Sequence, residues 1–467
     1  MPPPPRPAAN ALLDGPILRT LLSLAWPNAL AFLAGTLVAV AETSYIGRLG
    51  IEALAAIALV FPCVMLTMSM SGAAMGGGVA SAIARAIGAG DRDRAENLAT
   101  HALLIAVFFG LVFMLGMLTG GRHLLELLGG RGDVLAQALA YSQVYFGGAV
   151  LTWLVNTQAG ILRGMGNMKL PSLMVANSAF LQIILGGTLG LGLGPVPQFG
   201  MPGVATGSLI AYAINIAIMS WYLFSGRSRI VPRLRGFRMQ WALFADILKV
   251  GVVSCFSPLQ NTLTNLILTR MLAVFGTATL AAYGIGARLE YVLATIAFSV
   301  GIGSVPMIGV AIGAGRIARA RWVAWTTGLV AVIVVGALAG AVAAFPDPWV
   351  NLFTDDAGAR TASRQFLQMV APFYTFIGLA SAMYFSSQGA GNVIGPVLAQ
   401  TARLLFILLG GWYLAAQAAT AASFFTLTAG SMIWLGVLSC AAVALTRWGP
   451  RTADAKGRLV LTQSADK

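Results

Sequence analysis

The sequence has few charged residues. Only 9% of its 467 residues are Asp, Glu, Lys or Arg, whereas soluble globular proteins average about 25%. Hydrophobic residues make up 58%, and the mean hydropathy is +0.82. Because no soluble fold of this size buries so much apolar surface, lipid must surround much of the chain. The composition therefore predicts an all-α polytopic membrane protein.

Cysteine and histidine are also scarce, which limits the possible chemistry. Cys63, Cys255 and Cys440 form no CxxC pair, and His101 and His123 stand in no metal-ligand spacing, so we expect no disulfide, metal or cofactor. Neither a Walker A motif nor HExxH or GxSxG is present. No filter-like carbonyl motif suggests a channel. The sequence therefore predicts a protein that is not an enzyme and that draws any energy from an ion gradient.

The net charge of +14 comes from short loops between apolar runs. That distribution is typical of membrane orientation and argues against nucleic-acid binding. Most of the 29 Lys and Arg fall in the two termini and in alternate loops on one side. We therefore expect both termini in the cytoplasm and, since the tails are short and the N-terminus has no cleavable signal pattern, a bacterial inner membrane.

Long apolar runs separated by Gly, Pro and charged residues predict twelve transmembrane helices. The second and eighth runs are long enough to tilt or kink and contain the Gly-rich stretches "GAAMGGG" and "GIGSVPMIG". The predicted spans are 17–47, 53–87, 98–120, 137–161, 171–193, 204–224, 246–275, 279–314, 322–345, 362–388, 397–414 and 423–446.

An internal repeat divides these helices into halves. Three motifs recur at a separation of 225 or 226 residues, which spans six helices and returns the chain to the same side of the membrane. The halves are therefore expected to be parallel repeats, a common arrangement in secondary transporters. The pairs are "LAA" at 54–56 and 280–282, "AIGAG" at 86–90 and 311–315, and "GMGNMKLP" at 164–171 with "GAGNVIGP" at 389–396.

The repeat predicts a division of the chain into five segments. They are a disordered N-terminal tail (1–16), an N-terminal six-helix lobe (17–224), a basic cytoplasmic linker (225–245), a C-terminal six-helix lobe (246–446) and a cytoplasmic C-terminal tail (447–467). The linker sequence "SGRSRIVPRLRGFRMQW" favours a simple connector. Binding of acidic lipid head groups is the alternative.

Several motifs together resemble one transporter family. "AWPNAL", "AETSYIGRLGIEALAA", "LRGMGN" and "AAYGIGARLE" are similar, in order and spacing, to the multidrug and toxin extrusion (MATE) family of the multidrug/oligosaccharidyl-lipid/polysaccharide flippase superfamily. The resemblance covers residues 17–446. It implies two pseudo-symmetric six-helix bundles, a central cavity, and antiport of organic cations against protons or sodium.

The resemblance also assigns roles to particular positions. Glu42 matches the carboxylate of the first helix. The Asn and Asp of the fifth helix in DinF-like members fall near Gln182 and Gly186, so the second acid is missing. The acids of the seventh and tenth helices in NorM-like members fall near Asn261 and Ile377. Sodium, if it is the coupling ion, would therefore have fewer acids to bind it.

Glu42 is the leading candidate for ion coupling. It lies about 9 Å inside the Arg48 end of its helix. One interpretation is an interfacial carboxylate that reaches water or pairs with Arg48. Because acids inside a membrane are costly and mark functional sites, we favour a proton-carrying or substrate-contacting role.

Charged residues in the second half leave two interpretations open. Glu290 is a candidate for a second coupling group, and Arg288 for the substrate cavity. The alternative is a structural Glu–Arg pair. Arg270 lies within the seventh run, and a structural role is expected for Arg403.

Neutral polar residues and methionines complete the candidate set. Gln182 is assigned to ion coupling, whereas Asn28, Asn177, Asn261, Met65 and Met68 are assigned to the substrate cavity. Flexible, polarizable Met side chains suit a wall that adapts to many ligands. Polar residues in membrane helices more often link helices to one another, and Met more often faces lipid or core, so these remain the alternatives.

These observations favour a monomeric exporter that exchanges small organic cations for protons, or for sodium, within membrane lipid. A flippase or exporter of a lipid-linked or amphipathic metabolite is the alternative. Such a carrier of anionic lipids would be expected to have several cations in its cavity, and only Arg270, Arg288 and Arg403 are candidates. A receptor or scaffold that transports nothing would explain neither the repeat nor Glu42.

Overall fold

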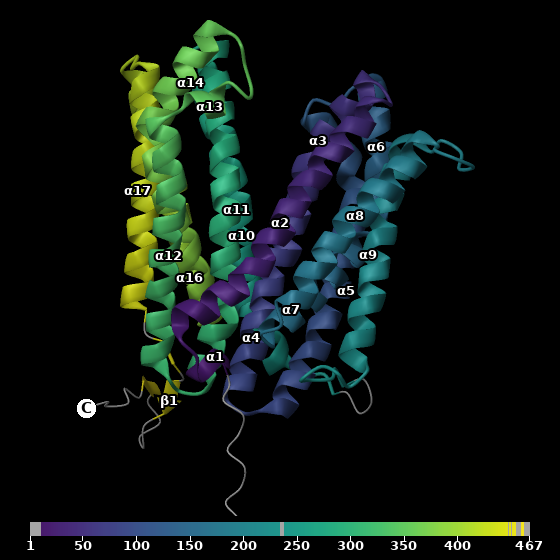
Figure 1. Ribbon diagram of the computed structural model, residues 1–467, viewed down its shortest axis with the longest axis vertical. Helices are drawn as coiled ribbons and strands as arrows, with labels where there is room; N and C mark the ends of the chain where they lie inside the picture. Colours follow the sequence, from purple (N-terminus) through teal and green to yellow (C-terminus); the bar gives the residue numbers. More distant parts are fainter. Residues whose placement is uncertain (1–10, 234–237, 447, 450, 454–458, 462–467) are drawn as a thin grey trace, which may run out of the picture. The chain divides into compact units, whose positions relative to one another are not determined.

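The computed structural model describes residues 11–233, 238–446, 448, 449, 451–453 and 459–461. Nearly all of them are helical (Figure 1). Strands occur, within these residues, in the C-terminal tail, where β1 (Arg451–Ala453) and β2 (Leu459–Leu461) pair antiparallel. The helical elements are α1 (Ala11–Asp14), α2 (Ile17–Gly47), α3 (Ile51–Ser69), the π-helix η1 (Met70–Gly76), α4 (Gly77–Gly88), α5 (Arg92–Leu127), α6 (Gly132–Gly147), α7 (Ala149–Gly164), α8 (Lys169–Leu191), α9 (Gly200–Phe224), α10 (Trp241–Ala273), α11 (Thr277–Gly313), α12 (Ile317–Ala344), α13 (Asp347–Val350), α14 (Ala357–Val370), the 3₁₀ turn η2 (Ala371–Phe373), α15 (Tyr374–Gly389), α16 (Ile394–Ala416) and α17 (Ala421–Leu445).

Each of the twelve predicted spans corresponds to one helix or to one series of consecutive helices. Within the described residues, ten of them are long and apolar enough to cross a membrane. Another span is formed by α6 and α7, which meet at a bend of 49°. The remaining one is α2, whose apolar part includes Ile17–Phe32. The fold is the predicted twelve-helix, all-α architecture of an integral membrane protein.

The two Gly-rich stretches have different effects on their helices. The first stretch, residues 72–78, overlaps the π-helix Met70–Gly76, which lies between α3 and α4. Such a distortion is rare and occurs mostly as a single turn inside α-helices. The second lies in α11, which continues for 37 residues with Pro306 inside it.

The start of the chain differs from the prediction. Ala11–Asp14 lie within the segment 1–16 that was predicted to be disordered, yet they form α1. The Asp14 carboxylate pairs with Arg316 at 2.8 Å, and Arg319 donates hydrogen bonds to backbone carbonyls of the same segment. These distant arginines stabilise a turn that the local composition does not predict. Residues 1–10 lie outside the described residues.

The chain packs as two compact units, and two of their boundaries fall inside the long helices α2 and α10. The N-terminal unit comprises residues 26–83 and 91–255, and the C-terminal unit comprises residues 11–25, 84–90 and those from 256 onward. The sequence instead predicted lobes made of whole helices. A helix of 31 residues such as α2 is about 46 Å long, which exceeds the hydrocarbon thickness of about 30 Å. One helix can therefore contribute to both units.

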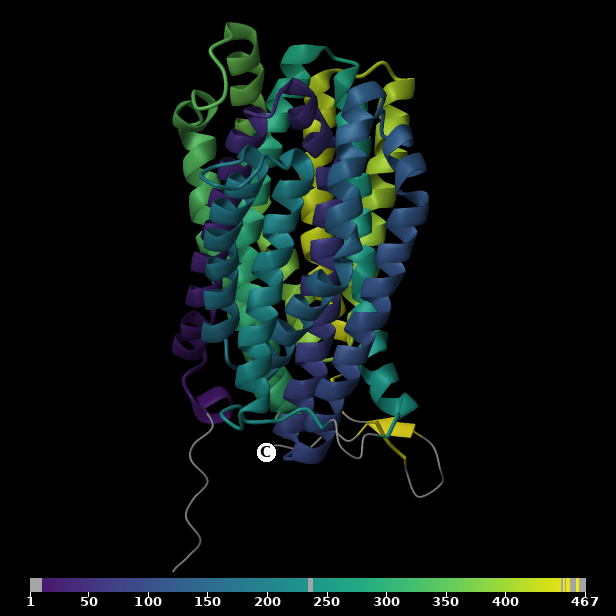
Figure 2. The same ribbon diagram turned by 90° about the vertical axis from the view of Figure 1, so that its right-hand side faces the viewer.

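In the N-terminal unit, α8 and α9 run side by side in both views (Figures 1 and 2), and α5 packs on α6 and α7. The core includes Val60, Phe146 and several tyrosines. Small residues allow close contact between backbones here, as is typical of membrane helices. A Cβ atom at Gly160 would lie 2.6 Å from the carbonyl oxygen of Gly76, so no larger residue fits at position 160.

In the C-terminal unit, α11 is the central helix. Most residues in its most apolar stretch are buried, and the helix contacts α12, α14 and α15. Phe366, Tyr374 and Phe425 belong to the core of this unit. A Cβ atom at Gly301 would lie 2.4 Å from the ring of Phe385, so glycine is required for that packing.

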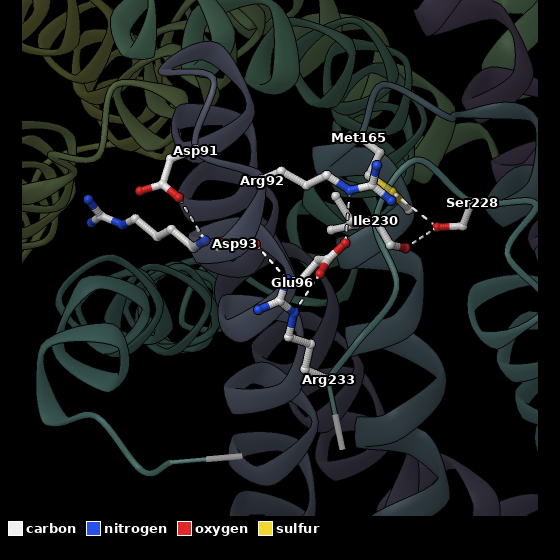
Figure 3. A network of polar contacts seen from close by, with 9 residues as sticks. Asp91, Arg92, Asp93, Glu96, Met165, Ser228, Ile230 and Arg233 are labelled. Carbon is white, nitrogen blue, oxygen red and sulfur yellow. Dashed lines mark hydrogen bonds and ion pairs between the residues drawn. The ribbon is translucent and has the colours of Figure 1, made fainter. Parts of the chain in front are cut away.

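The basic linker lies against the start of α5 (Figure 3). Arg233 donates from Nε to Glu96 at 2.8 Å and pairs through Nη2 with Asp93. These two acids raise the pKa of the Arg233 guanidinium. Arg92 reaches the other Glu96 oxygen at 2.9 Å, so Glu96, whose side chain is only 8% exposed, joins two cations.

A second set of contacts holds the end of the linker and the start of α10. The backbone N–H of Gln240 donates to His101 Nε2 at 3.0 Å, and His101 Nδ1 lies 2.7 Å from the Asn97 carbonyl. Since Nε2 accepts, these contacts assign the proton of the neutral ring to Nδ1. Arg94 pairs with Asp246 of α10 at 2.9 Å. Helix α10 starts at Trp241, inside the predicted linker, where these contacts fix its first turns.

Candidate functional site

Glu42 lies in a group of tyrosines in the N-terminal unit. Its Oε1 atom accepts a long hydrogen bond, 3.5 Å, from the hydroxyl of Tyr141. The carboxylate of Glu42 also interacts electrostatically with the hydroxyl groups of Tyr45, Tyr145 and Tyr212. All four tyrosines are buried, whereas Glu42 is partly buried. The arrangement surrounds one carboxylate with neutral hydroxyl groups.

Three helices supply these tyrosines. Tyr141 and Tyr145 are four residues apart on α6, so they share one face, and their rings stack with centroids 5.8 Å apart. Tyr45 follows Glu42 by one turn on α2, and Tyr212 comes from α9. None of these four tyrosines is among the site residues predicted from the sequence. The spacing of Tyr141 and Tyr145 within an apolar span was the available signal.

In helix α8, Gln182 and Gly186 lie where the resemblance places the Asn and the Asp of DinF-like members. Gln182 interacts with the hydroxyl of Tyr212, so it joins the same polar group as Glu42. Gly186 lies close to Tyr45: a Cβ atom at position 186 would be 2.7 Å from the Tyr45 hydroxyl oxygen. The missing second acid therefore has no space in this structure, because a tyrosine hydroxyl already lies there.

Met65 and Met68 pack from α3 against the apolar cluster that contains these tyrosines. Both are partly buried. Asn156 of α7 donates to the Met68 sulfur at 3.7 Å and to Ser71 Oγ at 2.9 Å. The two methionines thus lie in the same unit as Glu42, beside a polar link between helices.

Asn28 and Asn177 both take part in links between helices. Asn28 is 2% exposed and accepts a hydrogen bond from Ser172 of α8 at 3.3 Å. Asn177 donates to Asn215 of α9 at 2.7 Å, and Asn215 donates to the Met174 carbonyl at 2.8 Å. Such hydrogen bonds stabilise helix pairs in lipid, which is the alternative role considered for these residues.

The C-terminal unit contains a separate charged pair. Glu290 lies 4.0 Å from Arg403 of α16, whose side chain is 2% exposed and also donates to Ser431 at 3.4 Å. Arg288 is exposed, and its guanidinium lies 4.8 Å from the ring centre of Phe353. Glu290 therefore faces Arg403 and is not paired with its near neighbour Arg288.

Asn261 lies exposed on α10 in the C-terminal unit. Ile377, near which the resemblance places the tenth-helix acid of NorM-like members, lies in the core. Among the described residues, no three His, Cys, Asp or Glu side chains come together as metal ligands. The described side chains that interact with Glu42 are tyrosines, with Gln182 beside Tyr212. A cation bound there would therefore meet one carboxylate together with hydroxyl and amide oxygens.

Comparison with known proteins gives consistent matches. The MatE family model matches residues 27–188 and 254–414, one match in each half of the chain. A protein described as a FAD transporter from Shewanella oneidensis is 30% identical over 353 residues, which cover 74% of this chain and 76% of the relative. A probable multidrug resistance protein NorM from Thermotoga maritima is 25% identical over 400 residues, 82% of each chain. The solved structure of a MOP superfamily transporter from Pyrococcus furiosus has the same fold, with a TM-score of 0.82 at 23% identity over 93% of this chain and 95% of that one.

Proposed function

Because the chain belongs to the MatE family, whose members are transporters and not enzymes, we propose that it is a secondary active exporter of small organic molecules, organic cations foremost. Export is driven by the entry of protons, with sodium as the alternative coupling ion. The protein lies in the bacterial inner membrane with both termini in the cytoplasm, as the distribution of Lys and Arg favours. It acts as a monomer among membrane lipids and needs no cofactor.

The observation that carries this proposal is the single carboxylate of Glu42 among four tyrosines. A hydroxyl that donates to the carboxylate stabilises its ionised form, whereas the surrounding apolar core favours its protonated form. Opposing effects of this kind suit a group that gains and loses a proton in each transport cycle. Ionised Glu42 attracts a cationic substrate, and a proton arriving from outside displaces that substrate.

The stoichiometry of exchange determines how much free energy such a site can supply for transport. Exchange of one proton for one monovalent cation moves no net charge, so only the pH difference contributes. One pH unit is worth about 1.4 kcal/mol, or roughly tenfold accumulation. We assign coupling to Glu42, with Gln182 as a neutral neighbour. Glu290 has Arg403 beside it at 4.0 Å, so we assign it to a structural ion pair.

The test is counter-transport in proteoliposomes. Ethidium movement is followed under an imposed pH gradient and then under a sodium gradient, for the wild type and for Glu42→Gln. We expect transport driven by pH that is lost in the variant. The control is Glu52→Gln, which neutralises an exposed carboxylate in the first turn of α3. Transport by Glu42→Gln at the wild-type rate would refute the role of Glu42, and drive from sodium alone would assign sodium as the coupling ion.

A second candidate function is export of an anionic amphipathic metabolite. The relative described as a FAD transporter is 30% identical, which favours this alternative over a general flippase. Arg288, exposed above the ring of Phe353, offers a cation beside an aromatic ring, a combination that suits a dinucleotide with phosphates and a flavin ring. Uptake of FAD into the same vesicles, without ethidium transport, would support it.

A further inference from the structure

A groove lies at the beginning of α12 in the C-terminal unit. It has a volume of about 470 Å³ and is lined by Ala318, Arg321, Trp322 and Trp325. Helix α12 is a membrane span, so its first turns lie where hydrocarbon gives way to head groups. Tryptophan is enriched at that depth because its ring is apolar and its N–H is polar. The groove therefore combines interfacial indoles with one cation.

Arg321 has no acidic partner within the described residues, unlike its neighbour Arg316, which pairs with Asp14. Its Nη2 atom donates to the Thr446 carbonyl at 3.2 Å, and the guanidinium lies 5.9 Å from the ring centre of Trp448. The indole N–H of Trp448 is buried and finds no acceptor among the described residues. Positive charge and an unused donor thus lie together at the positive end of a helix dipole.

An apolar stripe runs from the groove along α12. Trp322, Trp325, Leu329 and Ile333 are 68%, 41%, 60% and 59% exposed. Their spacing of three, four and four residues places them on one face of the helix. This exposed face continues from the groove toward the middle of the span, where an acyl chain would lie.

We propose that this groove is a binding site for an anionic phospholipid. The phosphate lies on the Arg321 guanidinium, which matches phosphate oxygens in geometry and charge. The glycerol backbone lies between the indoles of Trp322 and Trp325, and one acyl chain follows Leu329 and Ile333. A free phosphate uses only the Arg321 part of the site. A zwitterionic lipid brings its own cation close to Arg321, so the groove selects for net negative head groups.

The experiment measures lipid binding to the purified full-length protein by native mass spectrometry. The probes are dioleoyl phosphatidylglycerol, dioleoyl phosphatidylcholine and inorganic phosphate. We expect the wild type to bind phosphatidylglycerol more tightly than phosphatidylcholine, and Arg321→Gln to weaken phosphatidylglycerol binding roughly fivefold, as expected for one cation near an anionic surface. Phosphatidylcholine binding should not change.

Two further variants separate the groove from general charge effects. Arg227→Gln is the matched control, because Arg227 also stacks on an indole, that of Trp221 at 4.6 Å, but lies outside the groove. Trp322→Ala removes an exposed side chain that lines the groove and leaves Arg321 unchanged, and we expect it to weaken phosphatidylglycerol binding. The proposal is overturned if the wild type shows no preference for phosphatidylglycerol, if Arg227→Gln weakens binding as much as Arg321→Gln, or if Trp322→Ala changes nothing. Displacement of the lipid by millimolar inorganic phosphate would assign the groove to a free anion instead.

Discussion

The close approach of Gly186 to Tyr45 predicts that substitutions at these two positions are not additive. A methyl group at position 186 would lie 2.7 Å from the Tyr45 hydroxyl oxygen but 3.4 Å from the ring carbon that carries it. The first distance forces a shift, whereas the second is an ordinary van der Waals contact. Removing the hydroxyl with Tyr45→Phe therefore leaves room for the methyl group of Gly186→Ala.

The expected magnitudes follow from two opposing effects. Replacing Gly by Ala inside a helix gains about 1 kcal/mol of helix propensity, and overpacking in a core costs roughly 1–3 kcal/mol. Gly186→Ala alone should therefore reduce the free energy of unfolding by up to about 2 kcal/mol. In the Tyr45→Phe background only the propensity gain remains. The coupling between the two substitutions should equal the overpacking cost, about 1–3 kcal/mol.

The assay is unfolding in detergent micelles for the wild type, both single variants and the double variant. Gly187→Ala is the control, because its methyl group would meet the Tyr45 ring at 3.6 Å and carries the same propensity gain. We expect Gly187→Ala to stabilise equally in both backgrounds, whereas Gly186→Ala stabilises only with Tyr45→Phe. Equal effects of Gly186→Ala in the two backgrounds would refute the steric argument.

Two other contacts give further predictions. Arg403→Met leaves Glu290 without its cation, so we expect the free energy of unfolding, measured by denaturant titration, to fall by about 3 kcal/mol. Adding Glu290→Gln should recover much of this loss, and strictly additive effects of the two substitutions would contradict the pairing. Arg233→Ala removes the bonds to Glu96, so amide hydrogen exchange of linker peptides should become faster than in the wild type. The control Arg227→Ala should not have this effect. Unchanged exchange in Arg233→Ala would contradict a linker that is held on α5.

The number and places of the helices could be predicted from the sequence because lipid imposes a strong, local requirement. A span needs about 20 apolar residues, and the loops between spans concentrate the charges. The internal repeat adds a second local signal, and the MatE model matches once in each half. The Gly-rich stretch "GAAMGGG" (72–78) was also predicted to loosen its helix, and the π-helix Met70–Gly76 overlaps it.

The partners of the polar residues could not be predicted, because they depend on contacts between distant segments. Glu290 meets Arg403 from another helix, although Arg288 is much nearer in sequence. The apolar pattern gave no indication of which face of α6 carries Tyr141 and Tyr145 toward Glu42. Nor did it reveal that the compact units divide α2 and α10 internally. In each case tertiary packing, rather than local propensity, decides the result.

The replacement of a second acid by a tyrosine hydroxyl has a consequence for the transport cycle. With Gly186 closed off by Tyr45, the group around Glu42 changes by one charge when it binds or releases a proton. Under the proposed mechanism, exchange with a monovalent cation is then independent of membrane potential, whereas export of a dication works against it by about 2.3 kcal/mol per 100 mV. A neutral substrate gains the same amount. Comparing monovalent, divalent and neutral substrates in vesicles clamped at different potentials should reproduce this order, and a potential-dependent rate for a monovalent cation would require a second titrating group.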